Sequence, residues 1–208
     1  MKINLSSHQN TGSINVALRC PNCGHHGTFI PVGTDIFVPS EQIIIGQRKC
    51  PNTKCNGHLF IIANSSGSIL KTYPSETIPF DKTGIPDRIL SAFNEAIVCH
   101  SNSCFVASAI MIRKTLEEIC DFEKSVGKNL SERLKALGTK ILIPKELIEG
   151  MNELRLLGND AAHIEANTFE QIGKDEIEIS IEFTKEILKA TYQYEDLLSK
   201  LRSLKKQS

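Results

Sequence analysis

Four cysteines in two short pairs constrain this chain more than any other feature. Cys20 and Cys23 lie in Cys-Pro-Asn-Cys-Gly, and Cys50 and Cys55 lie in Cys-Pro-Asn-Thr-Lys-Cys-Asn-Gly. Each pair closes a tight turn in which backbone N–H groups can point at sulfur. Two such turns supply the four thiolates of a tetrahedral Zn²⁺ site. The spacing therefore predicts a zinc ribbon that holds a structural Zn²⁺ ion.

Two disulfides are the alternative use of these four cysteines. The chain has seven cysteines, an odd number, and Cys99, Cys104 and Cys120 lie in segments with a helical pattern. Residues 1–10 contain one Lys and no apolar stretch, so we expect no secretory signal. These features favour a reducing compartment, the cytoplasm, and therefore zinc.

Three histidines beside the cysteines, His25, His26 and His58, are alternative metal ligands. Because four thiolates already complete a tetrahedral site, we expect these histidines to face solvent or to donate to phosphate or partner groups.

Charge is unevenly distributed along a chain of zero net charge. Residues 1–75 contain six basic and two acidic side chains (+4), and residues 76–208 contain 18 basic and 22 acidic ones (−4). Four thiolates on one Zn²⁺ leave the first segment near +2. This mild bias permits nucleic-acid binding without establishing it. No apolar run approaches the roughly 20 residues that a transmembrane helix needs, so no membrane span is expected.

The pattern of apolar residues divides the chain into a β-rich part and a helical part. Short strands are predicted at 14–19, 27–32, 36–38, 42–47, 58–63 and 68–73. Residues 1–73 are thus the predicted zinc ribbon domain, residues 74–85 a Pro-rich linker, and residues 86–208 a helical bundle. The fold class predicted is α+β.

About five helices are predicted after the linker, because the apolar period changes to that of an α-helix. They cover about 86–99, a segment ending near 120, 129–138, 144–164 and 175–204. Asn129 followed by Glu132 resembles a capping box. Short connections between helices of this number are typical of a bundle.

The last predicted helix has apolar residues at alternating spacings of four and three. They are Phe183, Ile187, Ala190, Tyr194, Leu197, Leu201 and Leu204. This spacing serves equally for packing inside the bundle and for pairing with a second copy of the chain. The pattern therefore leaves both alternatives open, with a homodimer as our expectation.

Arg155, Asn159 and His163 recur at intervals of four residues in the fourth predicted helix, so they lie on one stripe. Cleavage of RNA without a metal needs a base for the ribose 2′-hydroxyl and a cation for the charge that grows on the phosphate. His and Arg supply these two functions. Gly158 beside the stripe indicates close approach of another helix or a bend.

An ordinary structural role is the alternative for these three residues. Lone Arg and His side chains are common on amphipathic helices, where they pair with carboxylates and neighbouring helix ends.

Three stretches of the chain resemble a bacterial family of uncharacterised helical domains. They run from Ile85 to Ala96, from Ala107 to Glu118, and through Leu-Arg-Leu-Leu-Gly-Asn-Asp-Ala-Ala-His at 154–163. Members of this family are often preceded by a zinc ribbon and sometimes joined to restriction-enzyme subunits. The segment Arg48–Phe60 is similar to that ribbon.

This family looks related to the HEPN superfamily, whose active members are dimeric, metal-independent endoribonucleases of toxin and phage-defence systems. The resemblance implies a HEPN-like bundle in which Asn159 and His163 match the polar residue and the His of the catalytic motif. Gly158 occupies the position of the motif's Arg, and seven residues separate Arg155 from His163.

Arg113 and Glu117 also match the family pattern. Their structural interpretation is an ion pair within the helix, or a link to Asn159 or Asp160 that ties two helices together. Their functional interpretation makes Arg113 the phosphate-binding cation.

The sequence thus predicts a nucleic-acid-associated accessory or defence-type protein of a prokaryote. RNA or DNA is its expected partner, together with a protein of a restriction or toxin–antitoxin system. Endoribonuclease activity through Arg155, Asn159 and His163 is the finer hypothesis. The alternative is a non-catalytic adaptor in which the zinc ribbon is only a scaffold. A nucleotide-binding role is not supported, since no Gly-rich phosphate loop is present.

Overall fold

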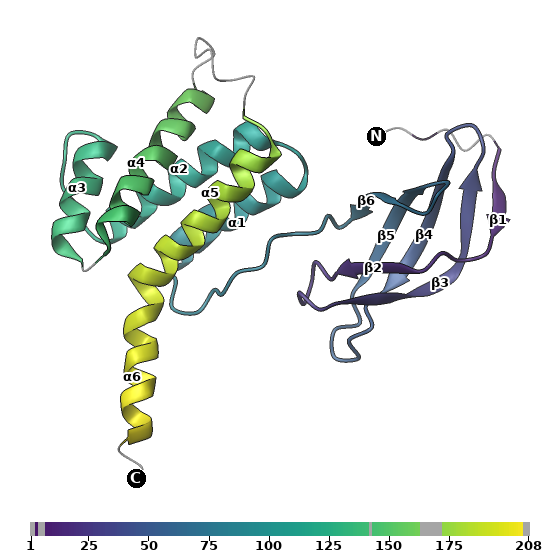
Figure 1. Ribbon diagram of the computed structural model, residues 1–208, viewed down its shortest axis with the longest axis horizontal. Coiled ribbons are helices and arrows are strands. Elements are labelled where there is room, and N and C mark those ends of the chain that lie inside the picture. Colours follow the sequence, from purple (N-terminus) through teal and green to yellow (C-terminus); the bar gives the residue numbers. More distant parts are fainter. Residues whose placement is uncertain (1–2, 4–6, 142, 163–171, 206–208) are drawn as a thin grey trace. The chain divides into compact units, whose positions relative to one another are not determined.

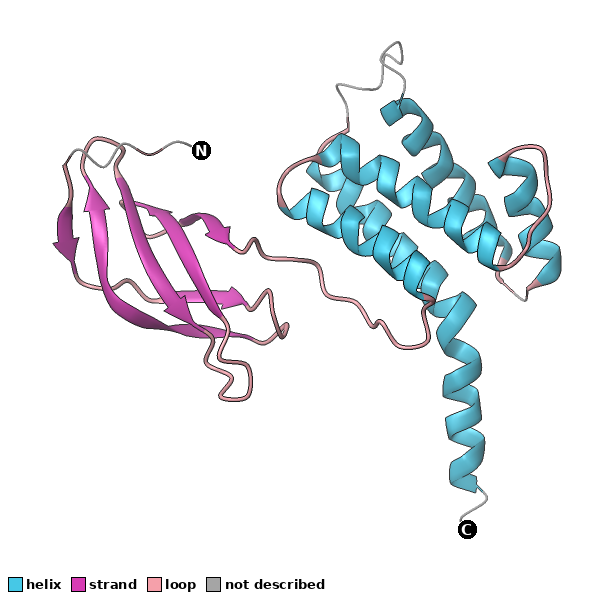
Figure 2. Ribbon diagram, turned by 180° about the vertical axis from the view of Figure 1, so that it is seen from behind, coloured by secondary structure: helices cyan, strands magenta, loops and turns pink. Residues whose placement is uncertain are grey.

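Strands fill the first part of the chain and helices the second, as Figures 1 and 2 show. The computed structural model describes residues 3, 7–141, 143–162 and 172–205, and the side chains of all of these except 195, 196 and 205. The chain divides into two units, residues 1–79 and residues 80–208, so the division falls inside the predicted linker. The predicted α+β class, with a β-rich first part and a helical second part, is confirmed.

The first unit, here the sheet unit, is a six-stranded antiparallel sheet in the order β1-β3-β4-β5-β6, with β2 paired to β3. Its strands are β1 (Gln9–Thr11), β2 (Val16–Arg19), β3 (His26–Val38), β4 (Ile43–Lys49), β5 (His58–Asn64) and β6 (Ile69–Tyr73). Strand β1 was not predicted, because three polar residues show no alternation. The strands predicted at 27–32 and 36–38 form one strand, β3, whose register shifts between Val32 and Ile36.

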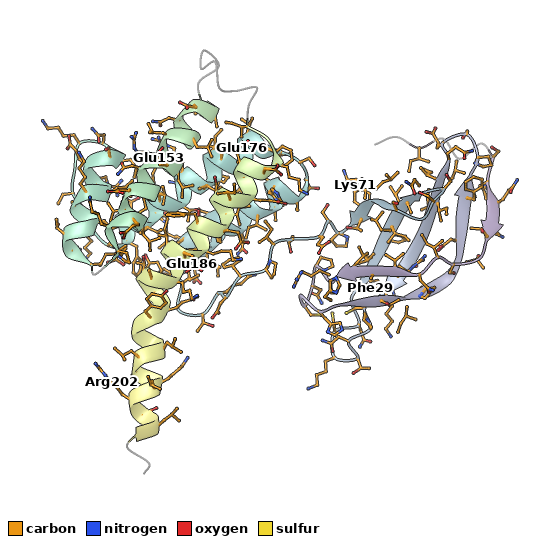
Figure 3. All side chains as sticks on the ribbon, viewed as in Figure 1. Phe29, Lys71, Glu153, Glu176, Glu186 and Arg202 are labelled. Carbon is orange, nitrogen blue, oxygen red and sulfur yellow. The ribbon has the colours of Figure 1, made fainter. Side chains whose placement is uncertain are left out.

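The two faces of this sheet are covered differently. On one face, β2 packs across the sheet and buries Phe29, which Figure 3 labels, together with Leu59 and Ile61. On the other face, Ile3 packs against a small buried cluster around Ile62. The sheet unit therefore has two small apolar cores in place of one large one.

The described part of the second unit, here the helical unit, contains six α-helices and one π-helical turn. They are α1 (Asp87–Ser101), α2 (Phe105–Phe122), α3 (Leu130–Lys140), α4 (Lys145–Ala162), α5 (Lys174–Leu188), η2 (Lys189–Gln193) and α6 (Tyr194–Lys205). Helix α2 packs against α1, α4 and α5. At the start of α3, the Asn129 side chain accepts a hydrogen bond from Glu132 N at 3.0 Å, which is one half of the predicted capping box. The Glu132 carboxylate accepts from Lys128 N at 2.8 Å, one residue before the N-cap that the box would use. In the described part of the chain, no helix combines the length and apolar character that crossing a membrane demands.

The predicted fifth helix runs through α5, η2 and α6. Its apolar seam is buried or half-buried in α5 and exposed in α6. Ile187 is fully buried in α5. Leu197, Leu201 and Leu204 in α6 are 63, 57 and 66% exposed. Figure 1 shows α6 continuing beyond the other helices of its unit. Packing inside the bundle therefore accounts only for the first part of the seam.

Candidate functional site

The four predicted metal ligands, Cys20, Cys23, Cys50 and Cys55, come together at one end of the sheet unit. Their sulfur atoms all lie within 4.8 Å of one another. The Sγ atoms of Cys20 and Cys55 are 3.7 Å apart, and those of Cys23 and Cys50 are 3.8 Å apart. All four are free thiols. Because a disulfide needs sulfurs about 2 Å apart, this arrangement is compatible with a metal site and not with two disulfides.

The two turns that carry these cysteines repeat the same backbone design. Cys20 N donates to His25 O, and Cys50 N donates to Gly57 O, each at 2.8 Å. The residue that follows each pair has a positive φ, 71° at Gly24 and 50° at Asn56. Glycine and asparagine are the residues that most readily adopt this conformation. The local sequence thus selects both turns.

Two asparagines cross between the turns, and sequence reasoning did not identify them. The Asn22 side chain donates to Cys55 Sγ at 3.3 Å, and the Asn52 side chain donates to Cys23 Sγ at 3.7 Å. Each Asn therefore contacts a sulfur of the opposite turn. The repeated Cys-Pro-Asn at both turns is the sequence signal that would have revealed this pairing. Side chains of this kind orient metal ligands and reduce the charge on them.

The environments of the sulfurs differ in polarity. Burial raises the pKa of the Cys20 thiol and raises the pKa of the Cys50 thiol to about 12. The Asn22 amide, followed by the Gly57 backbone, lowers the pKa of Cys55 to about 7. Four thiolates so close together are stable only with a cation among them, since like charges oppose each other's ionisation.

The three histidines beside the cysteines, His25, His26 and His58, are exposed, and none belongs to the four-sulfur cluster. His58 Nδ1 lies 3.0 Å from the side-chain amide of Gln47.

A buried ion pair braces the strand that leads to the second turn, and it too was missed. Arg48 and Asp35 are both fully buried, and the guanidinium contacts the two carboxylate oxygens at 2.7 and 2.6 Å. Arg48 also donates to Ile14 O at 3.0 Å. A Cβ on Gly46 would stand 2.0 Å from Asp35 Oδ1, so this position admits only glycine. Residues 13 positions apart on different strands share no local pattern, so the pair could not be predicted from the sequence.

In the helical unit, α2 and α4 approach each other closely at Gly158. A Cβ there would stand 2.5 Å from Arg113 Cβ and 3.1 Å from Ala109 O. The expected close approach at this glycine is therefore present. A helix interior accepts glycine at a cost of about 1 kcal/mol, which close packing of two helices offsets here.

Arg113 connects these two helices. Its guanidinium donates to Asn159 Oδ1, and its Nε lies 3.2 Å from Glu117 Oε1. Both contacts of the structural interpretation, the ion pair within the helix and the link to Asn159, are thus observed. One turn before Asn159, Arg155 has a buried Nε without a hydrogen-bond partner among the described residues. The structure therefore brings Arg113, Arg155 and Asn159 to the same part of α4, while His163 lies outside the described residues.

These features define a class of protein: a sheet unit with a four-cysteine cluster, followed by a helical unit with an Arg and Asn contact between two helices. Residues 94–207, more than half of the chain, match the family described as "Domain of unknown function (DUF4145)". The chain belongs to this family. The matched region contains Arg113, Arg155 and Asn159, and the four cysteines precede it. No curated protein and no solved structure matches the chain.

Proposed function

We propose that the four cysteines hold one structural Zn²⁺. Thiolates at about 2.3 Å from a tetrahedral Zn²⁺ stand about 3.8 Å from one another. The separations of 3.7 and 3.8 Å between the two cross-turn pairs fit this value. The full set of sulfur donors also suits zinc, which such sites commonly bind. The ion would staple the sheet unit and take no part in chemistry, because no coordination position is left open.

We propose further that the chain is a nucleic-acid-associated accessory or defence-type protein that works in the cytoplasm of a prokaryote. The observation that carries this proposal is the contact of Arg113 with Asn159. It brings a second guanidinium to the part of α4 that contains Arg155. Guanidinium groups bind phosphate through paired hydrogen bonds, so two of them near one helix end suit a phosphodiester.

The finer part of the proposal is metal-independent cleavage of RNA, which the resemblance to the HEPN superfamily implies. His163 takes the proton of a ribose 2′-hydroxyl, whose oxygen attacks the adjacent phosphorus. The bond from phosphorus to the 5′-oxygen breaks, and the proton passes to that oxygen. The products are a 2′,3′-cyclic phosphate and a 5′-hydroxyl. Arg155 and Arg113 stabilise the charge on the phosphate, and Asn159 orients Arg113.

Incubation of purified protein with single-stranded RNA tests this mechanism. EDTA removes free divalent ions, and the zinc content is measured afterwards to show that the sheet unit is intact. We expect cleavage with cyclic phosphate ends, and its loss in His163→Ala and Arg155→Ala. Arg88→Ala, at an arginine whose side chain is 77% exposed, is the control and should cleave normally. Full activity in the His163 variant would refute the mechanism.

A protein-interaction role is the second candidate, and the exposed apolar side of α6 favours it. Tyr194, Leu197, Leu201 and Leu204 recur at heptad spacing and are 48 to 66% exposed. Such a stripe becomes stable when another helix covers it. The occupant that we propose is a second copy of the chain. A protein partner from a restriction or toxin–antitoxin system is the alternative.

Measurement of the mass in solution tests the dimer. We expect the wild-type chain to be a dimer and Leu197→Glu/Leu201→Glu to be a monomer. Ser199→Glu changes an exposed residue of the same helix and should remain a dimer. A wild-type monomer would exclude the second copy and leave a different protein as the occupant.

A further inference from the structure

The outer face of the sheet unit, opposite β2, is covered at one end by described residues. Strand registers place alternate residues of β3 to β6 on this face, because directly opposed residues point to the same side. At one end, Ile3 and the cluster around Ile62 close the face. At the other end the part of the chain that the structure describes leaves it open. The open face comprises Val32, Gln47, Phe60 and Tyr73 in one row across four strands, with Lys49 and Lys71 beside that row.

Two aromatic rings form the centre of the open face. Phe60 on β5 and Tyr73 on β6 are directly opposed, and they are 54 and 41% exposed. Their Cβ atoms are about 5 Å apart by the geometry of an antiparallel pair. Large aromatic side chains are usually buried, since each adds a large apolar area to the surface when it is not. Two exposed neighbours on a rigid sheet therefore indicate a surface that binds something flat and apolar.

Lysines flank the aromatic row on both sides. Lys49 lies two residues from Gln47 along β4, and Lys71 lies two residues from Tyr73 along β6. Lys71 Nζ is 5.3 Å from the centre of the Tyr73 ring, and Figure 3 labels Lys71. Strands β3 to β6 contain one acidic residue, Asp35, which is buried against Arg48. The open face thus combines exposed rings with positive charge and has no carboxylate.

A cavity lies near the end of the sheet that carries the cysteines. Its volume is about 140 Å³, and it is lined by Pro21, Asn22, His58 and Pro74, among others. His58 is opposite Lys49 in the sheet, and Pro74 follows Tyr73. Cys20 and Leu59 of the apolar core on the β2 side also line the cavity, so it lies beside the four-cysteine cluster and outside the aromatic row.

We propose that the open face binds single-stranded nucleic acid, with bases stacked on Phe60 and Tyr73 and phosphates beside Lys49 and Lys71. Every base has a flat π face that stacks on an aromatic ring, and adjacent cations hold the backbone. A protein partner would suit a face of apolar residues alone, but rings interleaved with lysines and free of carboxylates match a polyanion with exposed bases. The inference rests on the proposed association with nucleic acid and assigns the binding step to the sheet unit, apart from the α4 residues.

Fluorescence anisotropy with labelled oligonucleotides tests the proposal on the full chain. The probes are single-stranded DNA, 2′-O-methyl RNA and a DNA duplex. The first two lack the 2′-hydroxyl that cleavage needs, so the probe survives. We expect both single strands to bind more tightly than the duplex. Equal affinity for the two would indicate stacking alone, and a preference for the RNA form would indicate contacts to the sugar as well. Either result supports the open face.

Phe60→Ala and Tyr73→Ala should each weaken binding about tenfold or more, as loss of one stacked base predicts. Phe60→Tyr, which keeps a ring, should bind as the wild type does. Phe122→Ala is the matched control, because Phe122 is a 58% exposed phenylalanine of the helical unit. Lys71→Gln should lower the slope of log affinity against log salt by about 0.7, the value for one phosphate of a single strand. Unchanged zinc content shows that each variant is folded.

The outcomes separate this inference from the proposed function. Normal binding by Phe60→Ala/Tyr73→Ala, with RNA cleavage that requires His163, would overturn the inference and leave the proposed function in place. Binding that requires Phe60, without cleavage by any form, would support the inference and remove the nuclease. Absence of binding by the wild type would overturn the inference, and absence of both binding and cleavage would overturn the proposed function as well. A change of oligomeric mass in the double variant, with no oligonucleotide bound, would make the open face a protein interface and overturn the inference.

Discussion

The sheet unit and the helical unit are stabilised in different ways. In the sheet unit, Cys20 and Cys50 belong both to the sulfur cluster and to the main apolar core. The helical unit instead buries many aliphatic side chains completely, among them Ile89, Ile112 and Leu116. The helical unit is therefore stabilised by many apolar contacts. The sheet unit depends on a few polar groups, above all the cysteines of the sulfur cluster.

This difference predicts which substitutions destabilise each unit most. A unit of about 80 residues buries too little apolar surface to be very stable on its own, so a metal or another staple often adds to it. Loss of one staple should then unfold the sheet unit as a whole. The helical unit should lose stability in small steps, because no single contact dominates it.

Removal of one of the four cysteines that we propose as zinc ligands should have the largest effect. Cys50→Ser leaves three thiolates and disrupts the apolar core at the same point, and structural zinc contributes about 10 kcal/mol or more to such folds. We expect the sheet resonances to lose their dispersion in NMR spectra, while the helical resonances persist. Zinc content should fall from one ion per chain.

Cys104→Ser is the matched control, because Cys104 is an exposed thiol of the helical unit. It should keep both the zinc and the dispersed spectrum. A well-dispersed sheet spectrum in Cys50→Ser would contradict the view that the metal staples this unit.

Loss of one partner from the buried ion pair should come next. Asp35→Asn leaves the Arg48 charge without compensation in a fully buried position, which costs about 3–5 kcal/mol. Denaturant unfolding of the sheet unit measures this loss. Glu76→Gln, at a half-exposed residue 3.9 Å from Arg19, should cost about 1 kcal/mol or less. Asp35→Leu/Arg48→Met, which removes both charges, should recover much of the stability. Equal effects of Asp35→Asn and Glu76→Gln would show that burial of the pair is unimportant.

Two glycines in helices should respond in opposite directions to alanine. Gly158→Ala forces α2 and α4 apart, since the new Cβ would meet Arg113 Cβ at 2.5 Å, and should destabilise the helical unit by about 1–3 kcal/mol. Gly138→Ala meets Cδ1 and Cγ1 of Ile148 at 3.1 Å, a contact that a small shift of this partly exposed side chain relieves. It should be neutral or stabilise by up to about 1 kcal/mol, the gain in helix propensity. Thermal unfolding of both variants checks this contrast, and a stabilised Gly158→Ala would refute the tight contact.

The smallest effect concerns pH. Burial lowers the pKa of His100, and Lys174 acts in the same direction while Glu178 opposes it. The unfolded chain takes up this proton near pH 6.5, and the folded chain does so only at lower pH. The unfolded state therefore binds more protons in that interval, so this contribution to stability is complete above about pH 6.5 and decreases as the pH falls below it.

A comparison of thermal unfolding at about pH 7 and about pH 5 tests this sign. His100→Gln cannot be protonated in this range, so its helical unit should lose less stability on acidification than the wild type. A larger loss in the variant would show that Glu178, 3.5 Å from His100 Nε2, instead stabilises the protonated imidazole.

Local patterns in the sequence were enough to predict most of the helices and strands and the sulfur cluster. The four cysteines, the cap at Asn129 and the alternation of the strands are each encoded within a few residues, where spacing alone decides the geometry. The position of Gly158 likewise indicated a close helix contact. These predictions depend only on nearby residues and not on which helices and strands pack together.

Contacts between distant residues were decided only by the tertiary structure. Arg48 with Asp35, Arg113 with Asn159, and the row of Phe60 and Tyr73 each join separate elements, and their sequences contain no matching local pattern. The seam of the last helix shows the same limit, because heptad spacing is identical whether the partner lies inside the bundle or outside it. Sequence thus determined what each segment is, and the packing of segments determined which side chains meet, since long-range pairing depends on the whole fold.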